Sequence, residues 1–329
     1  MRLSSIFVIL LASASSSLAQ TPSPTPAVLP SPSPSPSPTP TPTPTPTPWA
    51  SPSPAPPPSP EPTPDAVVLL AQADEHYSRR SIGAIDEVAQ PQTVEAAIEL
   101  YRRALSLEPR NIEILAKLMR ALHFRGAYTG STLEEKKAIF DEGRQLGQAA
   151  VDRLEAEARQ KRGMSRIEAL RLVKGAPALY LWTAGHWGEW AMTRGKFAAA
   201  RSGAASRVRD LSQTVIEIDP LFEDAAGYRI LGRLHAEAPS IVFITGWVSR
   251  EKALLYLRRA HQIAPSHPTN SYFLAEALLD HEPAQRDEAL ALLEQCAALT
   301  PRPDFLLEDA RYARVARKLL DDLRRPPSP

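Results

Sequence analysis

A spacing of four, three and five residues recurs four times along the chain, and each copy ends in proline. The first three positions of each copy share one face of an α-helix, because steps of four and three match the helical period. Small residues there let a neighbouring helix approach closely, and the proline then stops the helix. The pattern therefore predicts a fold built from paired helices. The copies are Ala97-Tyr101-Ala104-Pro109, the weaker Val208-Ser212-Val215-Pro220, Ala253-Leu257-Ala260-Pro265 and Ala289-Leu293-Cys296-Pro301.

Composition between Asp65 and Arg325 supports the same fold class. Ala, Leu, Glu and Arg dominate this region, proline and glycine come at intervals, and runs of β-branched residues are almost absent. Strong helix formers separated by helix stops predict an all-α body. Its length suits one core or a string of stacked repeats.

The recurring spacing resembles the second half of a tetratricopeptide repeat (TPR), a helix-turn-helix unit that stacks into a superhelix. The first half of the repeat can be recognised in part. A Leu231-Gly232 pair stands at TPR-like spacing before the copy that starts at Ala253. The copies are unevenly spaced, so insertions interrupt the repeat. We predict an all-α, TPR-like helical-hairpin superhelix with insertions.

Three insertions stand out. Residues 81–92 form a loop within the first repeat. Ser131 or Thr132, with Glu134 or Glu135 three residues later, predicts a capping box that opens a long charged helix to about Lys161. The third insertion, Pro239 to Val248, is unusually apolar for a connection between two helices.

The segment Ala176 to Arg194 carries three of the five tryptophans and is apolar nearly all round. A helix of this kind is buried by other helices or crosses a membrane. His186, Glu189 and two glycines argue against crossing, so we expect a buried central helix. Its aromatic side chains either fill the core or line an internal cavity.

The apolar insertion has three interpretations: it plugs the helices, lines or closes a pocket, or meets a partner. If it and the tryptophan helix together enclose a cavity, the candidate ligand-binding residues are Trp182, His186, Trp190, Phe243 and Trp247. These five residues form our predicted site.

The N-terminus predicts export. A basic residue, an apolar run and small residues ending at Ala19 form a signal peptide over residues 1–19, with cleavage after Ala19. No cysteine near that point could carry a lipid anchor, so we expect a periplasmic or secreted protein without a membrane span. Residues 20–64 form a spacer rich in Pro, Ser and Thr, expected to be extended and disordered. The helical domain is predicted over residues 65–325, followed by a tail over 326–329.

Several functions have little support in the sequence. The formal net charge of +1 argues against nucleic-acid binding, and the single cysteine, Cys296, excludes an internal disulfide. No phosphate-binding loop, zinc motif or nucleophile elbow is present. His186 and Glu189 are three residues apart, as metal ligands or an acid–base pair could be, but a hydrogen-bonded core histidine is the favoured interpretation. We therefore expect no catalytic residues, metal or cofactor, and no enzymatic activity.

Two segments, Ala178 to Lys196 and Ile216 to Leu279, resemble the T component of TRAP transporters, a periplasmic TPR-like protein. The resemblance covers most of residues 69–299. It implies a trimer that binds the transporter's solute-binding protein and carries a hydrophobic tunnel for an apolar ligand. It also departs from the family, whose members often carry an N-terminal lipid-anchor cysteine where this chain has the spacer. The matching residues are Leu179, Tyr180, Trp182, Trp190, Asp219, Pro220, Arg229, Leu231, Gly232, Pro239, Lys252 and Ala260.

Two hypotheses for function follow. In the first, the chain is an exported, non-enzymatic accessory protein that handles an apolar small molecule together with a solute-binding protein. In the second, it is a structural adaptor of the cell envelope, with a filled core and no ligand. The long spacer favours the adaptor, because a tethered scaffold needs reach.

Overall fold

The computed structural model describes residues 65–195, 199, 201–241 and 244–325, which belong to one compact unit. Over these residues the chain is helical and forms no β-strand, which confirms the all-α prediction. The predicted signal peptide, spacer and tail lie outside the described residues, and so does Phe243. The elements are α1 (Ala66–Ser78), α2 (Pro91–Leu107), α3 (Ile112–Tyr128), α4 (Leu133–Gln160), α5 (Arg166–Arg171), α6 (Ala176–Arg194), α8 (Ala204–Ile218), α9 (Phe222–Glu237), α10 (Arg250–Ile263), α11 (Pro268–His281), η1 (Pro283–Gln285), α12 (Arg286–Ala297), η2 (Pro303–Phe305) and α13 (Leu306–Arg324).

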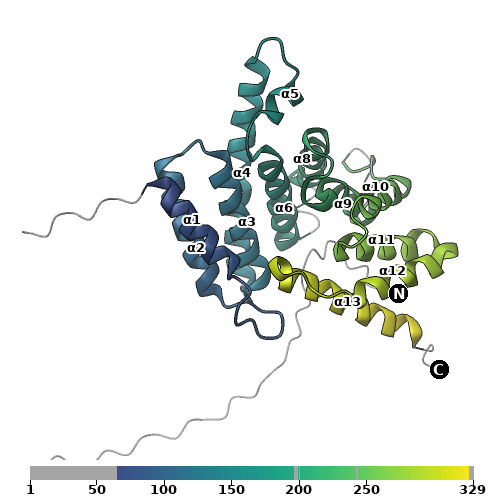
Figure 1. Cartoon of the computed structure of the whole chain (residues 1–329). Coiled ribbons are helices and arrows are strands. Elements are labelled where there is room, and N and C mark those ends of the chain that lie inside the picture. Colours follow the sequence, from purple (N-terminus) through teal and green to yellow (C-terminus); the bar gives the residue numbers. More distant parts are fainter. Residues whose placement is uncertain (1–64, 196–198, 200, 242–243, 326–329) are drawn as a thin grey trace, which may run out of the picture. The chain divides into compact units, whose positions relative to one another are not determined.

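Most helices that follow one another in the chain pack against one another, from α1 on α2 through to α12 on α13 (Figure 1); the short α5 instead packs against α4 and α8. The recurring small residues lie in these contacts: Ala97, Ala104, Ala253 and Ala260 are completely buried. Gly232 of α9 extends the same principle, because a Cβ atom there would meet the Leu257 side chain of α10 at 2.5 Å. The helical pairing and the irregular repeat confirm the TPR-like fold with insertions.

The long α4 helix begins as its sequence predicts. The Thr132 hydroxyl accepts a hydrogen bond from the Glu135 backbone N–H at 3.2 Å, and the Glu135 carboxylate accepts one from the Thr132 N–H at 2.7 Å. This reciprocal capping box satisfies two donors that helix geometry leaves free. The Thr132–Glu135 pair is therefore the one that forms, of the alternatives in the sequence.

Helix α6 is the buried centre of the fold, as predicted. It packs against α3, α4, α8 and α9, and both Leu179 and Tyr180 are buried in the core cluster that these helices share. Glycines on α4 permit the close approach: a Cβ atom at Gly143 would overlap the His186 ring, and one at Gly147 would overlap Thr183. Among the helices described, none combines the length and the hydropathy needed to cross a bilayer.

Candidate ligand-binding site

The residues of the predicted site that can be described do not meet in one cavity. Trp182 packs against the His123 ring, with 5.3 Å between ring centroids, whereas Trp190 packs edge-on against Trp187 at 5.6 Å. Trp247 packs against His235 at 5.4 Å, between α9 and α10. The separation on α6 follows from helix geometry, because eight residues advance about 12 Å along the axis and four-residue steps drift around it.

His186 is a core histidine. Its ring is completely buried, and its Nε2 lies 2.9 Å from the carbonyl oxygen of Met119. Because a carbonyl only accepts, Nε2 carries the proton, and Nδ1 is left without a hydrogen-bond partner among the described residues. Burial lowers the pKa of His186 to about 4, so the ring is neutral at physiological pH.

Glu189 faces His123 instead of forming a pair with His186. Its Oε1 lies 3.8 Å from the His123 Nε2, and burial raises the pKa of Glu189 to about 8. The described residues contain no group of three or more His, Cys, Asp or Glu side chains that could hold a metal ion. Both side chains thus face α3, where His186 contacts Met119 and Glu189 contacts His123.

The strongest candidate site is an apolar cavity of about 310 Å³ between α6, α8, α9 and the Pro239–Val248 insertion. Both α6 and the insertion contribute residues to its described lining, but the tryptophans of α6 are absent from it. Small residues take their place, because a glycine or alanine leaves space that an indole ring would fill. The described lining consists of Gly188, Ala191, Met192, Gly195, Ala199, Ala204, Ala205, Val208, Leu234, Ala238, Pro239, Ile241 and Thr245.

The described lining of the apolar cavity carries no charged side chain. Its one side-chain hydroxyl, on Thr245, donates to the Pro239 carbonyl and accepts from the Ile241 backbone N–H at 2.9 Å. The hydrogen bonds of this hydroxyl are therefore made within the insertion itself. Gly188 faces open space, since a Cβ atom built there meets nothing within 4 Å. The cavity can accept an uncharged apolar molecule and would exclude an ion.

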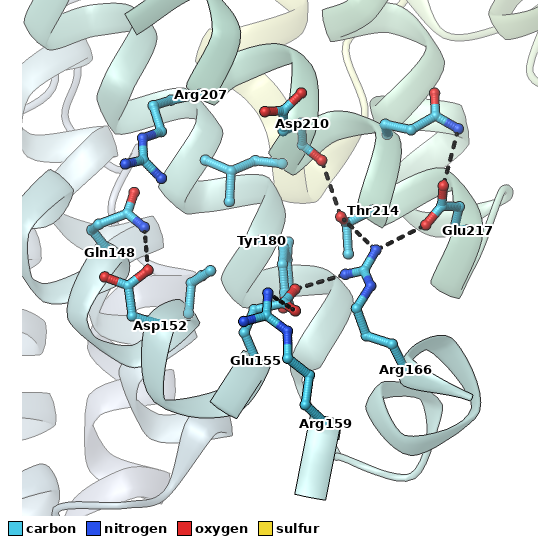
Figure 2. Close-up of a pocket in the computed structure, with 13 residues that line it drawn as sticks. Gln148, Asp152, Glu155, Arg159, Arg166, Tyr180, Arg207, Asp210, Thr214 and Glu217 are labelled. Carbon is cyan, nitrogen blue, oxygen red and sulfur yellow. Dashed lines mark hydrogen bonds and ion pairs between the residues drawn. The ribbon is translucent and has the colours of Figure 1, made fainter. Parts of the chain in front are cut away.

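A larger groove of about 530 Å³ between α4, α5, α6 and α8 is polar (Figure 2). Arg166 of α5 donates to Glu155 of α4 at 2.6 Å and to Glu217 of α8 at 3.0 Å. The Tyr180 hydroxyl also donates to Glu155, at 2.7 Å. These charges pair with one another and hold α5 against its neighbours, so we interpret the groove as structural.

The arrangement defines a TPR-like helical protein with an apolar cavity. Solved structures that resemble it include the TPR protein TTC0263 of Thermus thermophilus, at 17% identity over 78% of this chain and 97% of that chain, with a TM-score of 0.47. The TPR2AB domain of yeast Sti1 in a pHSP90 complex is 15% identical over 79% and 98%, with a TM-score of 0.28. Yeast Tom70 is 14% identical over 80% and 66%, with a TM-score of 0.26. No protein-family model matches the chain, and the comparison with curated proteins gave no match.

Proposed function

We propose that this chain is an exported, non-enzymatic helical-repeat accessory protein that binds an apolar small molecule in the apolar cavity. The observation that carries the proposal is the described lining, which is apolar and without charged side chains and comes from α6, α8, α9 and the apolar insertion. Nothing in a fold of stacked helices requires such a space, because protein interiors are normally filled.

Size and chemistry restrict the ligand. A volume of about 310 Å³ is at the lower end for small-molecule sites, so it suits a small apolar molecule or one end of a longer chain. Burying ~200 Å² of apolar ligand surface would contribute about 5 kcal/mol before the entropic cost of binding. The affinity would then be modest, as expected of a protein that takes up and releases its ligand.

The partner and the location belong to the same proposal. The resemblance of α6, α9 and α10 to the T component of TRAP transporters supports a periplasmic solute-binding protein as partner and a trimer as assembly. The N-terminal sequence supports export. The helical pairs of a TPR-like body would supply the surface on which such a partner docks.

The cavity can be tested by filling it from Gly188. The purified full chain is titrated with N-phenyl-1-naphthylamine, an uncharged apolar fluorophore, and compared with Gly188→Ala and Gly188→Leu. Alanine adds one methyl group and leaves most of the space, so binding should persist. Leucine should occupy the cavity and weaken binding at least about tenfold.

Equal fluorophore binding by all three folded proteins would contradict the cavity assignment. Native mass spectrometry, followed by solvent extraction, then reports whether an apolar passenger accompanies the protein and whether it is a trimer. A folded protein that carries no passenger and binds no fluorophore would instead support the structural adaptor.

A further inference from the structure

A second cavity, of about 210 Å³, lies between α1, α3 and α6 on one side and α9, α11 and α13 on the other. We call it the polar chamber. Its wall combines aromatic rings with charged side chains, unlike the apolar cavity. The phenyl, phenol and indole rings belong to Tyr77, Phe124, Tyr128, Trp182, Phe273, Phe305 and Tyr312.

Most charges on the wall of the polar chamber are paired with one another. Arg302 contacts Asp309 at 2.8 Å and Asp224 at 3.0 Å. Arg233 contacts Glu276 at 2.7 Å, and Glu308 accepts from Arg80 at 2.9 Å. These paired side chains link the helices around the chamber and are not free to bind a ligand.

Two charges on the same wall stay unpaired. The Arg120 guanidinium lies 5.1 Å from the Tyr77 ring centroid and 5.6 Å from that of Phe305, yet it forms no hydrogen bond or ion pair with any described residue. The Glu223 carboxylate likewise has no such partner in the described part of the chain. Burial raises the pKa of Glu223, and the positive charges of Arg120 and Arg229 act against that rise. A cation and a carboxylate thus face the chamber without direct partners.

The backbone that carries Glu223 is strained. Glu223, Asp224 and Ala225 have φ of 43°, 57° and 65°, a left-handed conformation that residues other than glycine rarely adopt. Such strain persists only where the surroundings enforce it, and it concentrates at functional sites.

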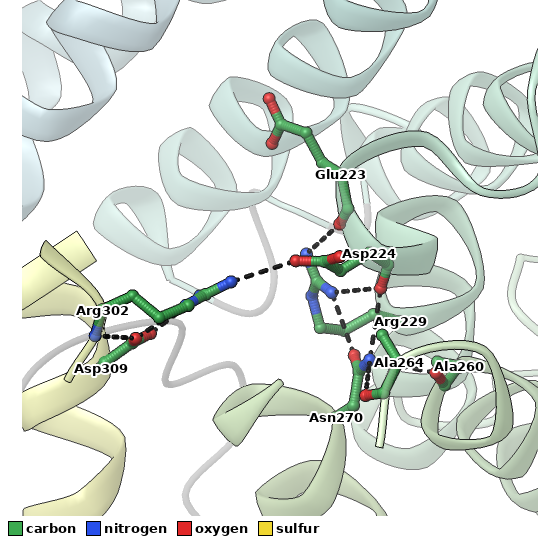
Figure 3. Close-up of polar contacts among 8 residues, drawn as sticks. All are labelled: Glu223, Asp224, Arg229, Ala260, Ala264, Asn270, Arg302 and Asp309. Atoms are coloured by element: carbon green, nitrogen blue, oxygen red, sulfur yellow. Dashed lines mark hydrogen bonds and ion pairs between the residues drawn. The ribbon is translucent and has the colours of Figure 1, made fainter. Parts of the chain in front are cut away.

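A polar network centred on the buried Asn270 enforces this conformation (Figure 3). Arg229 donates to the Asp224 carbonyl at 3.1 Å and to the Asn270 side-chain oxygen at 2.9 Å. The Asn270 amide donates to the carbonyls of Asp224, Ala260 and Ala264 at 3.0 to 3.2 Å. In Figure 3 the Glu223 carboxylate points away from this network, so the strained turn projects it out of the polar cluster.

The free charges specify complementary groups on a ligand. Arginine binds carboxylates through two parallel hydrogen bonds, and a free carboxylate binds an ammonium group. Four arginines and four acidic residues line the chamber, so a ligand without net charge is matched best. Aromatic walls favour an apolar body, and the volume is below that of a drug-sized site. We propose that the polar chamber binds an amino-acid-sized zwitterion with an apolar side group, its carboxylate on Arg120 and its ammonium on Glu223.

Calorimetric titration of the full chain tests this assignment, with L-phenylalanine and L-leucine as probes. Two analogues separate the charges: 3-phenylpropionate lacks the ammonium group, and phenethylamine lacks the carboxylate. We expect at least one of the two amino acids to bind with a stoichiometry of one per chain. Each analogue should bind at least about tenfold more weakly than L-phenylalanine.

Variants assign each charge to its partner. Arg120→Gln should weaken amino-acid binding at least about tenfold and abolish the preference for L-phenylalanine over phenethylamine. Glu223→Gln should abolish the preference for L-phenylalanine over 3-phenylpropionate. Arg103→Gln and Glu99→Gln change exposed side chains of α2 and serve as matched controls. Gly188→Leu should leave amino-acid binding unchanged, so this inference can fail independently of the proposed function.

Two results would overturn the inference. One is a folded protein that binds neither amino acid, which would make Arg120 and Glu223 mutual counter-ions across water. The other is binding of 3-phenylpropionate as tight as that of L-phenylalanine, which would make the chamber a simple anion site.

Discussion

At the scale of single residues, side-chain size decides which positions of α6 leave a cavity. Trp187 and Trp190 pack against each other and against Arg144, whose guanidinium lies 4.7 Å from each ring centroid. Gly188, between them in sequence, faces the apolar cavity. The large residues thus pack against neighbouring side chains, and the small ones leave the space of the apolar cavity. Candidate cavity residues in such a helix are better sought among glycines and alanines.

Glu189 makes stability depend on pH. Its pKa is about 8 in the folded chain, against about 4.5 when exposed, so between these values the folded state holds a proton that the unfolded state releases. Stability is therefore lost as pH rises through this window. Burial raises the pKa, while Arg311 and Lys136 oppose the rise. We predict that the free energy of unfolding of the wild type falls by about 2 kcal/mol between pH 6.5 and 9 through Glu189, and that Glu189→Gln abolishes this fall.

Urea denaturation at both pH values measures this effect, with the exposed Glu99→Gln as control. The buried histidines act with the opposite sign, since burial lowers the pKa of His186 to about 4 and that of His123 to about 3. Their contribution is lost as pH falls below about 6.5, outside the range compared. An identical alkaline loss in wild type and Glu189→Gln would rule out Glu189 as its source.

At the scale of elements, Asn270 joins α9, α10 and α11. Its side chain is completely buried and bonds carbonyls at the start of α9, in α10 and just after it. We predict that Asn270→Ala lowers the free energy of unfolding by about 2–3 kcal/mol, because several buried acceptors lose their donor. Chemical denaturation measures the loss. Gln92→Ala, at an exposed amide on α2, should change stability by less than about 0.5 kcal/mol.

The element scale also explains the left-handed turn at the start of α9. A helix could begin directly after Leu221, yet Arg229 and Asn270 bind the backbone carbonyls of the turn instead. Hydrogen–deuterium exchange would separate two outcomes for Asn270→Ala. Local loss of protection at α9 and α11 supports the network, whereas uniform loss over all described helices would indicate only a weaker core.

At the scale of the whole molecule, packing has to supply the stability, because the chain has a single cysteine. Cys296 is 1% exposed between α11 and α13, and burial raises the pKa of its thiol to about 12. We predict that a disulfide reagent such as Ellman's reagent labels Cys296 only when the domain unfolds. The labelling rate should rise with urea in parallel with the unfolded fraction. Rapid labelling of the folded chain without urea would show a local opening of these helices.

The sequence by itself determined the fold class and much of its local structure. Helical period, helix stops and small-residue spacing predicted the paired helices, and Thr132 with Glu135 predicted the start of α4. The apolar segment from Ala176 predicted the buried central helix. All of these depend on interactions between residues that are close along the chain, and such interactions leave a periodic signature.

Only the tertiary structure decided where the open space lies and which charges face it. Gly188 and Val208 line one cavity because α6 and α8 pack together, which no local pattern encodes. Arg120 and Glu223 are over one hundred positions apart in sequence, yet they face one chamber. Arg233 and Arg302 on the same wall pair with Glu276 and Asp309. The strained turn, held by Arg229 and Asn270, points the Glu223 carboxylate away from its polar network. Function at such sites depends on contacts between distant segments, and these are set by packing.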